Sequence, residues 1–125
     1  MTDSILISTK KILGIDAAYT AFDVDIITHI NSAFSTLNQL GIGPVEGFMI
    51  IDDTTTWNML LDYDPRLNAV KSYVYLRVRL LFDPPTTSYL ITAMKEQVQE
   101  LEWRLNVVRE GDLYPIPPEE VIPWR

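Results

Sequence analysis

The sequence contains no cysteine and a single histidine, His29. Without cysteine, a disulfide, a thiol nucleophile and a thiolate zinc site are all excluded, and a histidine-dependent catalytic triad would have to use His29. No Gly-rich phosphate loop, Gly-x-Ser-x-Gly turn or paired-histidine metal motif is present. We expect His29 to be an exposed polar residue on a helix. These absences argue against an enzyme, and no cofactor is expected.

Positive charge is also scarce, because ten Lys and Arg stand against seventeen Asp and Glu, for a net charge of −7. This balance opposes the phosphate neutralisation that drives nucleic-acid binding, so sequence-specific DNA recognition is disfavoured. The N-terminal residues 1–4 carry an acid where a signal peptide would carry Lys or Arg, and no apolar run approaches the ~20 residues that span a membrane. We expect neither export nor membrane insertion, and the lack of cysteine suits a reducing cytoplasm.

What the chain does contain is enough apolar material for one globular domain, with 47% hydrophobic residues among 125. The periodicity of these residues predicts an all-α fold, a small bundle of four to five helices. The expected helices are a short one capped by Asp3 or Ser4 and ended by Gly14, one over 22–40 ended by Gly41, a brief one over 57–61, one over 65–82, and one from 86–88 to Gly111. Between residues 41 and 53 we expect a long loop, in which residues 47–51 would allow one short strand.

The expected helix over residues 65–82 is apolar around most of its circumference, which predicts a central position in the bundle. It also contains Arg77 and Arg79, two residues apart and therefore on different faces. Arginine among apolar residues usually finds a carboxylate, either within the chain or across a subunit boundary. No acid before Asp83 is spaced to pair with them inside this helix, so Arg77 and Arg79 are candidates for inter-subunit contacts.

Acidic residues gather in the middle of the chain, where no Lys or Arg lies between residues 12 and 65. The group consists of Glu46, Asp52, Asp53, Asp62 and Asp64. Carboxylates close together can hold Mg²⁺ or Ca²⁺, but this spacing fits no EF-hand, and Asp52, Asp53 and Asp64 are expected to cap helices. No metal site is predicted. Among the tryptophans, we expect two core or groove-filling residues, Trp57 and Trp103, and one anchor, Trp124, near the C-terminus.

The last thirteen residues contain four prolines and can form neither a helix nor a central strand. A solvated tail would favour small and charged residues, whereas this segment is rich in aliphatic and aromatic ones. We therefore divide the chain into a helical domain, residues 1–111, and an extended arm, residues 112–125. The arm's predicted partner-binding residues are Leu113, Tyr114, Ile116, Val121, Ile122, Trp124 and Arg125.

Four segments of the sequence together resemble a known family. They are Leu13-Gly14-Ile15, Phe22-Asp23-x-Asp25-Ile26-Ile27-x-His29-Ile30-Asn31, Leu37-x-Gln39-Leu40-Gly41-Ile42-Gly43-Pro44, and Val74-Tyr75-Leu76-x-Val78-Arg79-Leu80-Leu81-Phe82-Asp83-Pro84-Pro85. In this order they resemble the head-to-tail connector (adaptor) proteins of tailed bacteriophages. The resemblance covers about residues 5 to 108, and its motifs are structural rather than chemical.

The resemblance implies a structural protein of the virion neck, assembled in the cytoplasm of the bacterial host. Its protomers would form a closed ring, expected to be dodecameric, on the portal protein, continue the DNA channel without sequence-specific binding, and support a stopper, head-completion or tail protein. The arm would dock on the portal or on a neighbouring protomer. Residues Glu46, Phe48, Asp52 and Asp53 of the loop are candidates for facing the channel or the stopper.

Two other interpretations stay open on the sequence alone. A small helical interaction or regulatory module of a prophage or host would bind one partner through the same arm without forming a ring. A metal-dependent enzyme would have to use the acidic group around Asp52.

Overall fold

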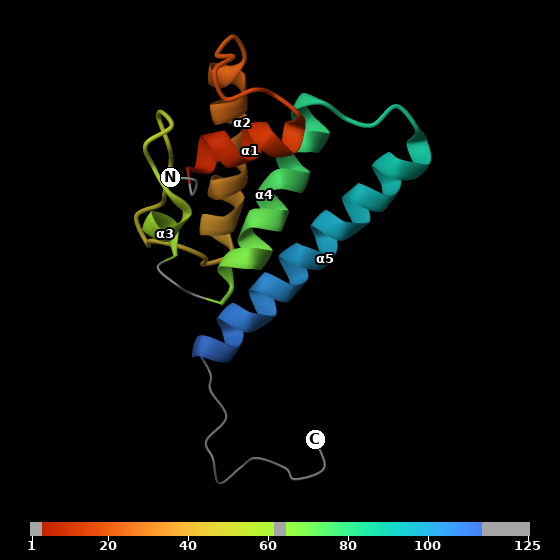
Figure 1. Ribbon diagram of the computed structural model, residues 1–125. Coiled ribbons are helices and arrows are strands. Elements are labelled where there is room, and N and C mark those ends of the chain that lie inside the picture. Colours follow the sequence, from red (N-terminus) through yellow and green to blue (C-terminus); the bar gives the residue numbers. More distant parts are fainter. Residues whose placement is uncertain (1–3, 62–64, 114–125) are drawn as a thin grey trace, which may run out of the picture.

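The computed structural model describes residues 4–61 and 65–113, with side chains described up to residue 107. Over these residues the chain forms five helices and no strand, which confirms the predicted all-α fold (Figure 1). The helices are α1 (Ile5–Leu13), α2 (Asp23–Gln39), α3 (Trp57–Leu60), α4 (Leu67–Phe82) and α5 (Ser88–Leu113). The strand that residues 47–51 would allow does not form, and an isolated bridge between Ser4 and Thr56 is the one β-type pairing described.

Helix α1 begins and ends at the residues that its sequence predicts. The hydroxyl oxygen of Ser4 accepts a hydrogen bond from the N–H of Ile7 at 3.2 Å, so Ser4 serves as the cap, and Asp3 lies outside the described residues. Gly14 ends the helix in a left-handed conformation, with φ of 80°, which glycine adopts at little cost. Ile5 and Leu6 are buried beneath this helix.

Helix α4 is the centre of the bundle, as its apolar circumference predicts. It packs against α1, α2 and α5, and its buried residues are Val70, Tyr73, Val74 and Val78. Helix α2 presents the matching stripe of buried residues, which comprises Ile26, Ile30, Ala33, Phe34 and Leu37. The helix begins at Leu67, two residues later than predicted, and ends before Asp83-Pro84-Pro85 because consecutive prolines cannot continue the hydrogen-bond ladder.

Helix α5 extends two residues beyond Gly111, where the sequence predicted its end. Glycine in a helix interior costs only about 1 kcal/mol relative to alanine, and it stops a helix only when it turns left-handed. Gly111 keeps the helical conformation, whereas the other four glycines have positive φ. The predicted apolar stripe is buried only in part, since Val98 and Leu105 are buried and Leu90 is 49% exposed.

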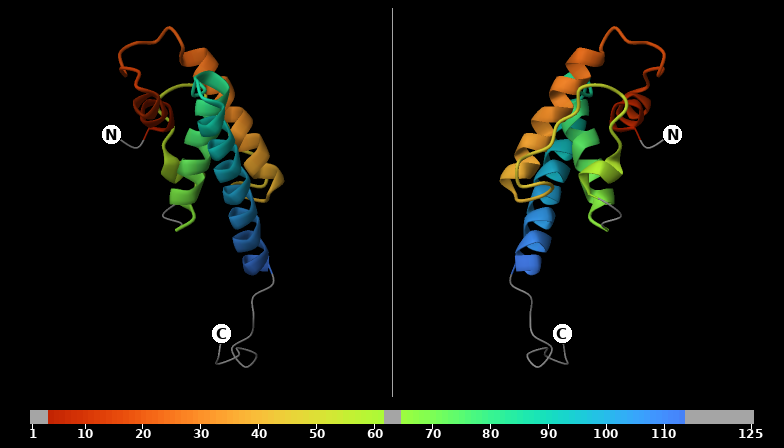
Figure 2. Two further views of the ribbon diagram at one scale, coloured as in Figure 1. Left: turned by 90° about the vertical axis from the view of Figure 1, so that its right-hand side faces the viewer. Right: turned by 90° about the vertical axis from the view of Figure 1, so that its left-hand side faces the viewer.

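The bundle has two dissimilar sides. Towards the connection over residues 83–87, α5 diverges from α4, so its first turns project from the bundle (Figure 1). The segment over residues 41–56 lies on the opposite side of the α2 and α4 pair, and Figure 2 shows α5 in front in one view and this segment in front in the other. The bundle therefore carries a long helix on one side and a long loop on the other.

Candidate interaction surfaces

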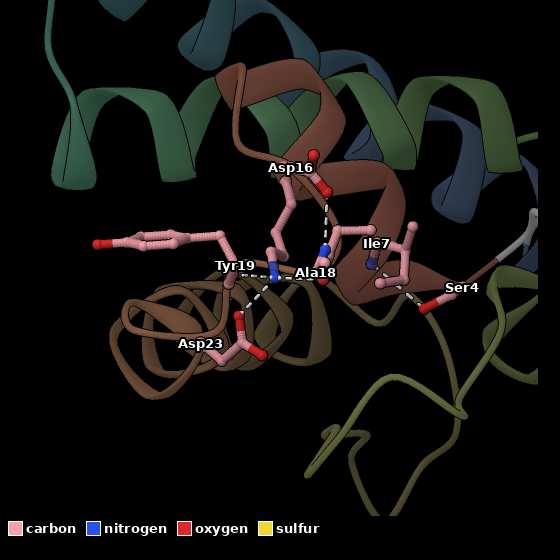
Figure 3. Close-up of polar contacts among 8 residues, drawn as sticks. Ser4, Ile7, Asp16, Ala18, Tyr19 and Asp23 are labelled. Carbon is pink, nitrogen blue, oxygen red and sulfur yellow. Dashed lines mark hydrogen bonds and ion pairs between the residues drawn. The ribbon is translucent and has the colours of Figure 1, made fainter.

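The connection between α1 and α2 is held by one buried lysine. The Lys10 ammonium nitrogen lies 2.8 Å from Oδ1 of Asp23 and donates to the carbonyl oxygens of Tyr19, at 2.6 Å, and Ala17, at 3.1 Å (Figure 3). The Lys10 side chain is 1% exposed. No local signal in the sequence identifies these partners, because the connection must fold back before its carbonyls surround the ammonium group.

Aromatic side chains cluster where α2 begins and α4 ends. The ring of Phe22 packs edge-on against Tyr19 at 5.7 Å and against Phe82 at 5.4 Å between centroids. His29 joins this cluster through Phe82, with 6.4 Å between ring centroids. The expectation that His29 is exposed is wrong, because α4 ends beside it and leaves it half-buried.

The loop over residues 41–56 is fixed to α2 by two asparagines. The side chain of Asn31 donates to the carbonyl oxygen of Ile50 at 3.0 Å and accepts from its N–H at 2.8 Å, as a neighbouring strand would. Asn38 donates to the carbonyl oxygen of Pro44 at 3.1 Å. Because both backbone groups of Ile50 are bonded to one side chain, this part of the loop has a defined orientation.

In that orientation, successive side chains of the loop alternate between the core and the outside of the bundle. Ile50 is 1% exposed, and Phe48 packs against Phe34 with 5.4 Å between ring centroids. Met49 and Ile51 point outward and are 66% and 78% exposed. Sequence reasoning selected Phe48 as a candidate to face a partner and missed Met49 and Ile51, although the period of two that separates inner from outer residues in an extended segment was present in the sequence.

The acidic candidates Glu46, Asp52 and Asp53 are all exposed. The carboxylate of Asp52 accepts hydrogen bonds from the hydroxyl of Thr54 at 2.6 Å and from its N–H at 2.9 Å, and these two bonds lower the pKa of Asp52. The prediction that Asp52 and Asp53 cap a helix is wrong, because α3 begins at Trp57 and Asp52 instead closes a local turn. Among the described residues, no three acidic or histidine side chains form a potential metal site; Asp62 and Asp64 lie outside them.

Arg77 has its partners inside the chain. Its guanidinium donates to the hydroxyl oxygen of Tyr73 at 2.7 Å and of Thr36 at 3.2 Å, and lies 3.9 Å from the carboxylate of Glu102 on α5. The Tyr73 hydroxyl donates to the same carboxylate at 2.7 Å. Burial of the phenol, together with this bond, raises the pKa of Tyr73 to about 12. The acid that sequence reasoning did not find for Arg77 comes from a different helix.

Arg79 is more exposed and pairs locally. Its Nε donates to the carbonyl oxygen of Asp83 at 2.7 Å and lies 3.9 Å from the carboxylate of the same residue. An inter-subunit role for either arginine is therefore not needed to neutralise it, and such a role stays a prediction.

Two open grooves follow the contact between α4 and α5. The first, with a volume of about 440 Å³, is lined by Tyr75, Leu76, Leu101 and Arg104, among others. Arg104 lies 2.5 Å from Glu100 of the preceding turn. The second groove, of about 590 Å³, lies nearer the divergent end of α5, and its walls include Leu80, Leu81, Pro84, Ile91 and Lys95.

The two tryptophans of the bundle differ in environment. Trp57 is fully buried and donates from its ring N–H to the Ser8 hydroxyl at 2.9 Å, which confirms a core position. Trp103 is 66% exposed, so the prediction that it fills the core or a groove of the bundle is wrong. It lies on the face of α5 that no other described helix covers.

The predicted arm residues lie outside what the structure describes. This applies to the side chain of Leu113, which ends α5, and to Tyr114, Ile116, Val121, Ile122, Trp124 and Arg125. In the described residues, none of the helices has the length and apolarity needed to cross a membrane.

The chain was compared with known proteins. A family model described as phage connector protein matches residues 5–112, which include every helix except the last residue of α5. Neither the curated proteins nor the solved structures give a match. The family match covers most of the 125 residues and agrees with the resemblance that the four sequence segments indicate. The chain belongs to the phage connector protein family, a family of structural rather than enzymatic proteins.

Proposed function

We propose that this protein forms the adaptor ring between the phage portal and the next head-completion or tail protein, and that the ring continues the DNA channel. The observation that carries this proposal is the family match across the whole helical bundle. The net charge of −7 agrees with it, because a channel lining that does not neutralise phosphates lets DNA slide rather than bind.

A closed ring uses one interface repeated around the axis, so each protomer must present two different and complementary surfaces. The bundle offers two dissimilar sides, with α5 on one and the loop over residues 41–56 on the other (Figure 2). Exposed acids of that loop, Glu46, Asp52 and Asp53, would face the channel or the next neck protein, where negative charge disfavours contact with DNA.

The arm, residues 112–125, of which the first two belong to α5, is proposed to dock on the portal or on an adjacent protomer. Its apolar residues alternate with prolines, and such a segment can lie extended along a partner and bury much surface for its length. Ordering it costs conformational entropy, which the burial of its anchors, Trp124 among them, must exceed.

The proposal is tested by mixing the purified chain with the portal protein of the same phage and measuring the mass of the product by light scattering. The expected product is a portal carrying one closed ring of this chain. A chain that stays unassociated with portal over the whole accessible concentration range would contradict the adaptor function. A monomer in the absence of portal is compatible with it, since the portal can act as the template.

The arm is tested separately by deleting residues 113–125. We expect this variant to lose portal binding or ring assembly. The matched control keeps the arm and replaces Glu119 and Glu120 by glutamine, which leaves every apolar anchor in place. If both portal binding and ring assembly survive the deletion, the arm does not have the proposed role.

A further inference from the structure

Two exposed surfaces of the bundle complement each other, and a single protomer cannot bring them together. The first is the outward face of the loop, here called the loop edge, formed by Val45, Glu46, Met49, Ile51 and Asp53. The second is the groove of about 590 Å³ between the end of α4 and the first half of α5, here called the α4–α5 groove.

The apolar residues of the loop edge are exposed and held in position. Val45, Met49 and Ile51 are 96%, 66% and 78% exposed, whereas isolated exposed apolar residues are normally scattered over a surface. The hydrogen bonds from Asn31 to both backbone groups of Ile50 fix the direction in which Met49 and Ile51 point. Little backbone entropy is therefore lost when a partner buries these side chains, which favours binding.

The α4–α5 groove has a mostly apolar lining and one lysine, Lys95, that can pair with an acid of a partner. Leu80, Leu81, Pro84 and Ile91 line it, and Leu81 is 50% exposed. Lys95 stands at its wall, is exposed, and forms no ion pair with another described side chain. Arg77 and Lys95 against Glu102 leave this groove one positive charge in excess. The neighbouring groove lacks such a cation, because its Arg104 is paired with Glu100.

The charges of the two surfaces are opposite. The loop carries Glu46, Asp52 and Asp53, and no Lys or Arg occurs between residues 12 and 65. Complementary charge across an interface sets its register and excludes wrong pairings. The loop and α5 lie on opposite sides of the α2 and α4 pair, so the two surfaces of one protomer belong to elements that are far apart (Figures 1 and 2).

We propose that the loop edge of one protomer docks in the α4–α5 groove of a second copy of this chain, with Met49 and Ile51 on Leu81 and Ile91 and the loop's acids beside Lys95. Such a contact joins two different surfaces and so propagates head to tail, which closes into a ring when the rotation allows it. This inference rests on the proposed ring, names its interface, and places Glu46 and Asp53 in that interface rather than at the channel or the next neck protein.

The absence of cysteine from the chain makes the contact directly measurable. In the variant that combines Met49→Cys with Leu81→Cys, assembled on portal and oxidised, the protomers should join by intermolecular disulfides into a ladder of oligomers. Each single variant should give at most a dimer. A variant that combines Met49→Cys with Glu100→Cys places the second thiol beside the other groove and should give no ladder.

Charge reversal provides an independent readout. Lys95→Glu should raise the concentration needed for half-maximal assembly about tenfold, since it places like charges together. Adding Glu46→Lys and Asp53→Lys should restore assembly. Asp52 is left unchanged because Thr54 uses its carboxylate.

The outcomes separate this inference from the proposed function. Rings that form on portal without a ladder from the Met49 and Leu81 pair overturn the interface and leave the adaptor function standing. A ladder from the Met49 and Glu100 pair overturns the interface as well, because the loop then docks elsewhere. The same holds if a variant that combines Leu81→Cys with Ile116→Cys forms a disulfide in place of the expected one, because the arm then fills the groove. A chain that forms no ring under any condition contradicts the proposed function itself.

Discussion

The ammonium nitrogen of Lys10 lies 2.8 Å from the carboxylate of Asp23, and this pair joins the end of α1 to the start of α2. The lysine charge stands at the negative end of one helix and the aspartate charge at the positive end of the other, so each also interacts favourably with its own helix. The carbonyl oxygens of Ala17 and Tyr19 accept the remaining ammonium protons. A charge can be buried in this way only when every proton finds an acceptor.

We predict that Lys10→Met lowers the free energy of unfolding by about 3 kcal/mol. The substitution leaves the carboxylate of Asp23 without its cation and removes the donor for two carbonyl oxygens. The loss should lie at the lower end of the range for buried pairs, because Asp23 keeps 25% exposure and some hydration.

Urea unfolding followed by circular dichroism measures this loss of stability. The control is Lys11→Met at the exposed neighbouring position, which should change stability by about 0.5 kcal/mol or less; equal losses would show that the pair is not stabilising.

A second prediction concerns pH and Tyr73. The folded protein holds the Tyr73 proton up to a pKa of about 12, whereas an unfolded tyrosine releases it near 10. Between these values the folded state binds more protons than the unfolded state, so stability is fully present below pH 10 and falls as the pH rises towards 12. Unfolding measured at several alkaline pH values should show this decline.

The control for that prediction is Tyr73→Phe. The substitution removes the titrating group, so the decline of stability over the same pH range should become smaller, although the variant starts from a lower stability because Arg77 and Glu102 lose a hydrogen-bond partner. The tyrosinate absorbance of the folded protein should also lose the component that appears near pH 12. An unchanged decline in the variant would assign the alkaline effect to other residues.

Local signals in the sequence predict the helices well, and long-range contacts account for what they miss. Ser4, Gly14 and Asp83-Pro84-Pro85 act within one or two turns of the chain, so the residues alone fix where α1 begins and ends and where α4 ends. Gly111 misleads because glycine permits a helix end without requiring one.

The interaction surfaces depend on contacts between distant residues and are therefore harder to predict. Nothing near Arg77 in the sequence points to Glu102, which α5 supplies. Trp57 and Trp103 are the same type of residue, yet Trp57 is enclosed by several elements and Trp103 lies on the uncovered face of α5. The alternation that turns Met49 and Ile51 outward was readable, but its fixed orientation comes from Asn31, nineteen residues from Ile50.

The third prediction compares two glycines with similar backbone conformations and different surroundings. Gly14 and Gly43 have φ of +80° and +91°, so alanine at either position suffers the left-handed conformation, at about 1–2 kcal/mol. An added Cβ meets nothing within 4 Å at Gly14 but lies 3.0 Å from a methyl carbon of Leu60 at Gly43. Leu60 is buried at 6% exposure and can move only by disturbing the core. Gly43→Ala should therefore destabilise the protein by about 1 kcal/mol more than Gly14→Ala, as measured by urea unfolding.

Because Gly43 lies at the base of the loop that carries Met49 and Ile51, Gly43→Ala should also weaken ring assembly, whereas Gly14→Ala should not. Equal effects of the two variants on stability and on assembly would mean that Leu60 adapts freely and that the position of the loop does not depend on this close approach.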